Sequence, residues 1–258
     1  MSHDDPGAAP QPSLIRFVLH RPRNSQNIGA AARALANTSA GALWVVEPEG
    51  YDRAQAARLA AGADEVLDSM TVARSLPEAL DGCVDVVMTT GKPPEDLVPL
   101  DPEATARRLV GAGGPVALVF GDEVRGLPNR DLRRAAAIAT IPTAAKASLN
   151  LAQAVLLFAY EILLARRTQN ARTQAHSSTA PLLHGEHAAA TRARADETML
   201  GLLRSRAQAL LLATGFLNPQ QPDRVLDELL RMLRRAEPSR REVELLLAVA
   251  DQLARLAR

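Results

Sequence analysis

The chain has 258 residues, of which 47 % are hydrophobic and 23 % charged, and its formal net charge is +1 at pH 7. These proportions exclude a disordered, collagen-like or disulfide-rich chain. Cys83 is the single cysteine, so no internal disulfide can form, and the polar N-terminus is unlike a signal peptide. No apolar stretch approaches the roughly 20 residues of a membrane-spanning helix. We therefore expect a cytoplasmic protein that does not enter a membrane.

Residues 14–165 alternate between apolar runs and helical patterns. Strands are expected at 14–19, 42–46, 65–67, 83–89, 115–120 and 137–141, and helices at 28–37, 54–61, 76–80, 102–110 and 149–165. This alternation predicts an α/β domain with a mostly parallel sheet. The strands are continuous apolar runs, which is expected where helices cover both faces of a sheet.

The composition changes on either side of this domain. Residues 1–13 are predicted to be a disordered tail, and the polar residues 166–195 a mobile linker. Three helical patterns follow at about 196–214, 223–236 and 240–257, and Ser239 and Glu242 have the spacing of a capping box for the third. A helical domain of residues 196–258 is small enough to be marginal alone, so we expect it to dock on another surface.

The near-zero net charge conceals an uneven distribution. Residues 1–165 contain 15 basic and 19 acidic residues, net −4, whereas residues 166–258 contain 15 basic and 10 acidic residues, net +5. All basic residues except Lys92 and Lys146 are arginine. A GC-rich genome explains the arginine bias, but it explains the charge division less easily. Because phosphate binding depends on Lys and Arg, the positive half leaves nucleic acid open as a partner.

Familiar catalytic and metal-binding motifs are absent from the sequence. There is no GxxxxGK[ST], no HExxH and no Cys/His cluster with metal spacing. The histidines at 176, 184 and 187 lie in the predicted linker, and a zinc site there is disfavoured. We therefore expect no metal.

Three segments nevertheless carry unusual patterns: residues 24–37 (NSQNIGAAARALAN), 119–129 (VFGDEVRGLPN) and 141–155 (IPTAAKASLNLAQAV). In the first, Asn27 could cap a helix, Gly29 indicates close backbone approach, and Arg33 and Asn37 share one face, which suits an anionic ligand. A tightly packed helix with an exposed arginine explains the same pattern equally well.

The second and third segments each follow an apolar strand. Gly121 and Glu123 come just beyond a strand end, where ligands bind in open α/β sheets, although an ordinary turn is the alternative. Ser148 is expected to cap the long helix that follows. Asn150 lies in a strongly apolar helix start, where a buried amide without partners would cost about 1–3 kcal/mol, so a structural or ligand-binding role is favoured.

Together, in this order and spacing, the three segments resemble the SpoU branch of the SPOUT RNA methyltransferases over residues 14–165. The tail resembles, more loosely, that of the TrmJ-type tRNA 2′-O-methyltransferases through Leu211–Leu217 and the arginine-rich Arg231–Arg235. The resemblance implies a deep trefoil knot, a homodimer with active sites at its interface, S-adenosylmethionine as cofactor, and methylation of the ribose of nucleotide 32 in the tRNA anticodon loop. A knot would be an exception to the usual rule for folds.

The resemblance also implies roles for particular residues. Arg33 would activate the ribose hydroxyl, Asn27 would support it, and Ser148 and Asn150 would complete the catalytic site. The residues implied for the cofactor site, with Glu123 orienting its segment, are Thr89, Thr90, Gly91, Gly121, Glu123, Ile141, Ser148 and Leu149. Because arginine is almost always protonated, Arg33 would act electrostatically or through an RNA phosphate rather than as a free base.

The sequence departs from the TrmJ-type pattern at two places. Gly91 and Lys92 follow Thr89-Thr90 where an arginine is usual, and the loop between Ile141 and Ser148 is slightly short. Lysine keeps the charge but loses the bidentate fork, so substrate selectivity is affected more than methyl transfer. The competing functions are ribosomal RNA 2′-O-methylation, a catalytically silent RNA-binding factor on the same scaffold, and an unrelated nucleotide-binding α/β protein.

Overall fold

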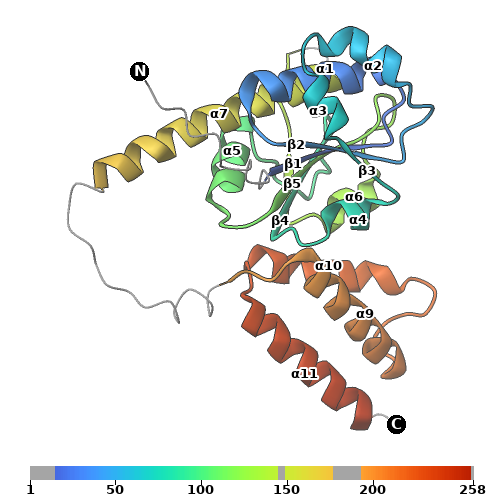
Figure 1. The fold of residues 1–258 in the computed structure, drawn as a ribbon. Coiled ribbons are helices and arrows are strands. Elements are labelled where there is room, and N and C mark those ends of the chain that lie inside the picture. The colour runs from blue at the N-terminus through green and yellow to red at the C-terminus, as the bar shows by residue number, and fades with distance from the viewer. Residues whose placement is uncertain (1–14, 145–148, 177–192, 257–258) are drawn as a thin grey trace.

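The structure, a computed structural model, describes residues 15–144, 149–176 and 193–256, and in them an α/β domain is followed by a helical region (Figure 1). The strands are β1 (Ile15–His20), β2 (Ala42–Val46), β3 (Thr71–Ala73), β4 (Asp85–Thr89), β5 (Val116–Phe120) and β6 (Ala137–Ala139). They form a six-stranded sheet in the order β3-β2-β1-β5-β4-β6, and every pairing is parallel. The predicted fold class is confirmed, and the knot stays a prediction.

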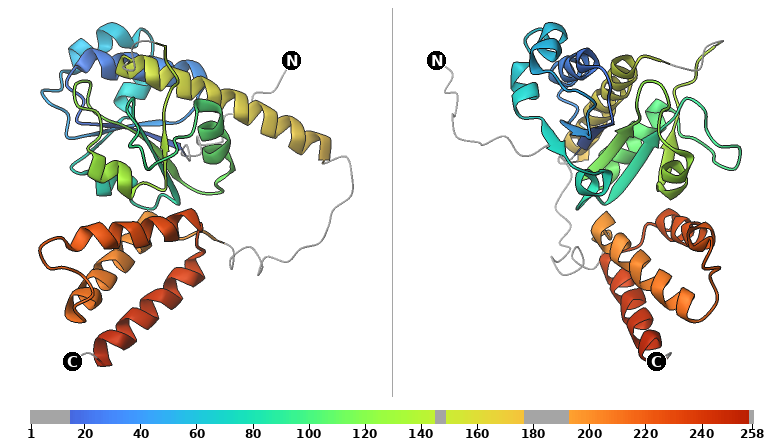
Figure 2. Two further views of the ribbon diagram at one scale, coloured as in Figure 1. Left: turned by 180° about the vertical axis from the view of Figure 1, so that it is seen from behind. Right: turned by 90° about the vertical axis from the view of Figure 1, so that its right-hand side faces the viewer.

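Two layers of helices cover the sheet because alternate side chains of its strands point to opposite faces. Phe17 and Leu19 pack into one core, and Val18 between them packs into the other. The first core includes residues of α1 (Ser25–Thr38), α2 (Arg53–Ala60), α3 (Asp64–Asp68), α5 (Pro102–Gly111) and α7 (Leu151–His176). The second includes residues of α4 (Leu76–Leu80) and α6 (Asn129–Arg134). Figure 2 shows these layers from two further sides.

Two short elements differ from the sequence prediction. The strand predicted at 65–67 is wrong, because these residues lie in α3, whose first turn carries Asp64 and Glu65. Acidic residues favour a helix start, and Leu67 is the buried residue of this helix. The strand that pairs with β2 at this edge of the sheet is β3 instead, and α6 was not predicted.

Both ends of α7 also differ from the prediction. The helix begins at Leu151, and the Asn150 carboxamide oxygen accepts hydrogen bonds from the backbone N–H groups of Ala152 and Gln153, at 2.9 and 3.3 Å. Asn150 therefore takes the capping role expected of Ser148, which lies outside the described residues. At its other end α7 continues to His176, so the predicted linker 166–195 begins as helix. The predicted tail 1–13 lies outside the described residues as well.

The helical region consists of α9 (Glu197–Ala213), α10 (Pro222–Arg235) and α11 (Arg240–Leu256), and it lies beyond α4 and α6 in Figure 1. It joins the α/β domain through the backbone of Glu197, whose N–H donates to the Cys83 carbonyl oxygen at 2.8 Å. A second junction is an ion cluster around Asp85, a fully buried carboxylate that Arg108 and Arg194 both approach. No helix in the described part of the chain is long and apolar enough to cross a membrane.

Candidate active site

A pocket of about 310 Å³ opens at the carboxyl ends of three neighbouring strands. Thr89 ends β4, Phe120 ends β5 and Ala139 ends β6, and all three line it. This is the edge at which open parallel sheets bind ligands, and the volume is within the range of small-molecule sites. The remaining lining residues are Thr90, Gly91, Lys92, Gly121, Asp122, Glu123, Val124, Arg125, Gly126, Ile141, Leu149, Leu151, Ala154 and Phe158.

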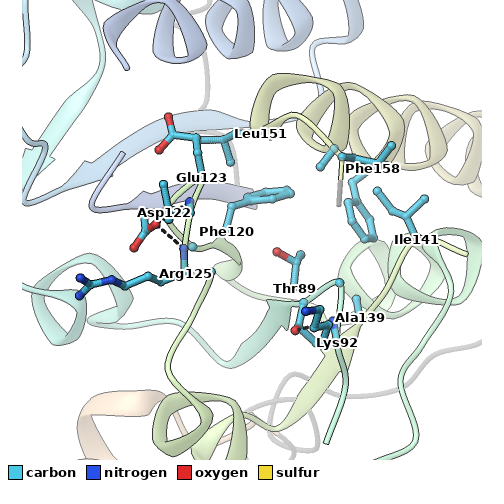
Figure 3. Close-up of a pocket in the computed structure, with 17 residues that line it drawn as sticks. Thr89, Lys92, Phe120, Asp122, Glu123, Arg125, Ala139, Ile141, Leu151 and Phe158 are labelled. Atoms are coloured by element: carbon cyan, nitrogen blue, oxygen red, sulfur yellow. Dashed lines mark hydrogen bonds between the residues drawn. The ribbon is translucent and has the colours of Figure 1, made fainter. Parts of the chain in front are cut away.

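The wall is apolar on one side and polar on the other. Phe120 and Phe158 meet edge to face with their ring centroids 5.8 Å apart, and Figure 3 shows Ile141 beside them. The Thr89 hydroxyl donates to the Val119 carbonyl oxygen at 3.0 Å, and Arg125 stands at the opposite side of the pocket. A ligand with a flat apolar part and a charged part would match this division.

Glu123 joins the first two sequence segments. Its carboxylate accepts hydrogen bonds from the backbone N–H groups of Arg23 and Asn24, at 2.9 and 3.2 Å, and from the Asn27 carboxamide at 2.8 Å. The start of α1 is thereby attached to the loop after β5. Burying the Asn27 side chain is not costly, because its amide is hydrogen-bonded.

Asn150 adds the third segment to the same network. Its amide nitrogen donates to the Asn27 carboxamide oxygen at 2.9 Å, while its own oxygen caps α7. Asn27 therefore bridges Glu123 and Asn150. It does not cap α1, as the sequence suggested, because Asn24 holds that position and accepts from the Gln26 N–H.

The loop after β5 is a tight turn that requires glycine. A Cβ on Gly121 would lie 2.2 Å from the carbonyl carbon of Gly126, which itself has a φ of +67°. The Asp122 carboxylate accepts from the N–H groups of Val124 and Arg125, each at 2.7 Å. Partial burial acts to raise the pKa of Asp122, but these N–H groups and the nearby Arg23 guanidinium together hold that pKa below its ordinary value.

The structure brings together most of the predicted site residues but leaves one apart. Thr89, Thr90, Gly91, Gly121, Glu123, Ile141 and Leu149 all line the pocket, and Asn27 and Asn150 are bonded to one another behind Glu123. Arg33 is exposed on α1, does not line this pocket, and has no hydrogen bond or ion pair with the described residues. Ser148 lies outside the described residues.

Close approach at Gly29 is confirmed, with a structural cause. A Cβ on Gly29 would lie 1.9 Å from the Ala56 carbonyl oxygen, so α1 and α2 pack with their backbones almost touching. The glycine therefore serves helix packing and does not open a space for an anion.

Sequence reasoning missed the aromatic pair and the support given by Arg23. Phe158 is eight residues beyond Asn150 on an apolar helix, and nothing in its pattern distinguishes a pocket wall from core. Arg23 was detectable only as the residue before Asn24, whereas its contacts with Glu123 and Asp122 depend on tertiary proximity. Within the described residues no group of three or more His, Cys, Asp or Glu could hold a metal ion.

Comparison with known proteins places this site in a family. The SpoU rRNA methylase family matches residues 14–160, and the C-terminal domain of tRNA methyltransferase TrmJ matches residues 199–258. A tRNA (cytidine/uridine-2′-O-)-methyltransferase TrmJ from Klebsiella pneumoniae is 37 % identical, covering 90 % of this chain and 93 % of its own. A tRNA (cytidine/uridine/adenosine-2′-O-)-methyltransferase TrmJ from Pseudomonas aeruginosa is 34 % identical over 95 % of both.

A solved structure agrees with the sequence matches. The crystal structure of TrmJ from Z. mobilis superposes with a TM-score of 0.76 at 28 % identity, over 95 % of this chain and 99 % of that one. Both the α/β domain and the helical region thus have counterparts in one protein. The chain belongs to the SpoU methylase family, and within it to the TrmJ methyltransferases.

Proposed function

We propose that this protein transfers the methyl group of S-adenosylmethionine to a ribose 2′-hydroxyl of tRNA, at nucleotide 32 of the anticodon loop. The observation that carries the proposal is the Asn27–Glu123–Asn150 link, which gathers the three motif segments around one pocket. The relatives from Klebsiella pneumoniae and Pseudomonas aeruginosa, which match nearly the whole chain, are named as tRNA 2′-O-methyltransferases.

The pocket suits the cofactor chemically. The apolar wall of Phe120, Ile141 and Phe158 can receive an adenine ring, and Thr90 and Gly91 also line the pocket. The Thr90 N–H donates a hydrogen bond to the Ala139 carbonyl oxygen at 2.9 Å, so this hydrogen bond holds the loop to β6 without a ligand. When bound, S-adenosylmethionine supplies an electrophilic methyl group on a sulfonium.

The residues around the pocket then have to orient and activate the hydroxyl. A ribose hydroxyl is a weak nucleophile, and a charged guanidinium can lower its pKa or bind the adjacent RNA phosphate. We assign this task to Arg33, which is exposed and unpaired among the described residues. Glu123 and Asn27 are hydrogen-bonded to each other, and we assign them the role of holding the loop after β5 in place.

Because Arg33 does not line the pocket of its own chain, we propose that it serves the pocket of a second copy in a homodimer. Four large apolar side chains share one exposed face of α7, at Leu156, Leu157, Tyr160 and Leu164, with 36–51 % of their surface accessible. A second copy would cover such a face. We propose that pairing through this face brings Arg33, on α1 of one copy, close to the pocket of the other.

Arg33→Ala tests the catalytic assignment. The variant should bind S-adenosylhomocysteine like wild type in calorimetry but lose at least about a hundredfold in methyl transfer, as when an electrostatic contact to the reacting group is removed. Arg58→Ala, which removes an exposed arginine from the neighbouring helix α2, is the matched control. Turnover by Arg33→Ala near the wild-type rate would remove Arg33 from the mechanism.

A mixing experiment tests the shared site. Gly91→Trp places a bulky ring in the pocket lining and should abolish cofactor binding. Dimers formed by co-expressing Gly91→Trp with Arg33→Ala should regain activity, because the open pocket receives Arg33 from the other protomer. If both homodimers are inactive and the mixture is too, the in-trans assignment is wrong.

Mapping the modified nucleotide decides between substrates. Methyl transfer to a bulk tRNA pool should give 2′-O-methylation at nucleotide 32. A solved structure described as treating 2-OH methylation of C/U34 on tRNA superposes with a TM-score of 0.50 at 26 % identity, so position 34 is the tRNA alternative to check. Methylation of ribosomal RNA instead would overturn the tRNA assignment, and cofactor binding without transfer to any RNA would indicate a silent RNA-binding factor. A cytoplasmic location is part of the same proposal.

A further inference from the structure

The pocket loop between β4 and α5 touches the helical region. Its residues 91–99 leave the sheet and return to it, and both ends are held by β6. The Thr90 N–H donates to the Ala139 carbonyl oxygen at 2.9 Å, and the Leu100 N–H donates to the Ile138 carbonyl oxygen at 2.8 Å. Between these two points, Gly91 and Lys92 line the pocket.

Asp96 attaches the middle of this loop to two helices, while Leu97 beside it packs against the second core. Its carboxylate pairs with Arg133 of α6 and, at 3.6 Å, with Arg231 of α10. The Arg133 guanidinium, and to a smaller extent Arg231, hold the pKa of Asp96 below its ordinary value, so the carboxylate stays charged at neutral pH. The neighbouring Val98 is almost fully exposed and offers no packing.

Between α10 and the loop the packing is incomplete, because both line a cavity of about 570 Å³. Asp96, Leu97 and Val98 of the loop line it, as do Arg231, Met232 and Arg235 of α10. Where two elements face each other across a space, the side chains that cross it set their separation. Arg231 lines this cavity, pairs with Asp96 and has only 19 % of its side chain exposed.

We infer that Arg231 of the helical region is a positioning residue for the cofactor pocket, acting through Asp96 on the loop that carries Gly91 and Lys92. The helical region thereby supports the pocket. This inference rests on the proposed function for the identity of the pocket's ligand.

The test uses the full chain and S-adenosylhomocysteine titrated in a calorimeter. Arg231→Gln should raise the dissociation constant about two- to fivefold, the range that partly exposed ion pairs support. Arg231→Lys should restore most of the affinity. Arg235→Gln is the matched control, because Arg235 lines the same cavity on the same helix and has no ion pair among the described residues.

A double-mutant cycle separates positioning from a general loss of structure. Asp96→Asn should weaken binding at least as much as Arg231→Gln, and combining the two should add nothing further. Hydrogen exchange should become faster at the Lys92 and Leu97 amides, which are hydrogen-bonded within the loop, in Arg231→Gln but not in Arg235→Gln. Equal affinities for Arg231→Gln and Arg235→Gln, or additive effects in the cycle, would overturn the inference. Wild-type protein that does not bind S-adenosylhomocysteine would refute the proposed function instead.

Discussion

Replacing Asp85 by Asn should destabilise the junction between the α/β domain and the helical region. The Asp85 carboxylate is fully buried, and its oxygens lie 2.7 and 3.1 Å from nitrogens of Arg108 and 3.7 Å from Arg194. Glu237 approaches both arginines, at 3.5 and 3.3 Å. Two positive and two negative charges thus compensate one another, two from each part of the chain.

The magnitude follows from what Asn leaves behind. Removing one partner of a buried ion pair costs about 3–5 kcal/mol, because the other charge stays buried without compensation. Here Arg108 and Arg194 keep 25 % and 20 % of their side-chain exposure and still face Glu237. We therefore expect a smaller loss, about 2–3 kcal/mol, and a melting temperature lower by roughly 4–10 °C.

Urea unfolding followed by circular dichroism measures the loss, and calorimetry shows whether the helical region melts separately. Glu103→Gln is the control, because its pair with Arg107 is also on α5 but lies at the surface and should contribute nothing measurable. Asp85→Leu combined with Arg108→Met should recover part of the stability, since apolar replacement of a buried pair is often neutral. If Asp85→Asn is as stable as Glu103→Gln, the buried cluster does not hold the two parts together.

Three further predictions follow from burial and close packing. Gly29→Ala should lose about 1–3 kcal/mol in urea unfolding, because its Cβ would lie 1.9 Å from the Ala56 carbonyl oxygen, whereas Gly201→Ala on α9 meets nothing and should be neutral or stabilising. Burial raises the pKa of the Cys83 thiol to about 11, so iodoacetamide at pH 8 should label the native protein roughly a hundredfold more slowly than the urea-unfolded chain; equal rates would contradict this. Burial lowers the pKa of His20, although the carboxylates of Asp131 and Glu47 oppose this shift. The unfolded chain therefore takes up the proton first, and the stability falls as the pH drops through about 6.5. His20→Gln should lose less stability between pH 7.5 and 5.5 than wild type, and an unchanged profile would refute the assignment.

The α/β architecture could be predicted because it depends on local patterns. Continuous apolar runs such as Val116–Phe120 are unfavourable anywhere except between two layers of helices, so they indicate a central strand without any knowledge of the partner. Gly121, just beyond β5, was accessible in the same way, since ligands of parallel sheets bind beyond the carboxyl ends of the strands, whereas Thr89 was predicted through the family resemblance.

Short and weakly patterned elements could not be assigned from sequence. The strand expected at 65–67 and the unpredicted α6 have too few residues for a period to be visible, and their state is set by what covers Leu67 and Leu132. Serine and asparagine are about equally good helix caps, so the sequence alone did not distinguish Ser148 from Asn150 as the cap of α7. Asn150 was chosen by a contact across the fold, with Asn27 at 2.9 Å.

The sequence by itself thus determined the α/β class and the central strands, because periodicity and backbone preference act over a few neighbouring positions, and its three motif segments indicated the site through their resemblance to a family. Tertiary structure alone decided which of these residues meet. Glu123 reaches Asn27 across 96 positions of the chain, and Arg231 lies near Asp96 from a different domain. Such contacts have no local signature, because they depend on how distant segments pack and on the desolvation of the charges that packing brings together.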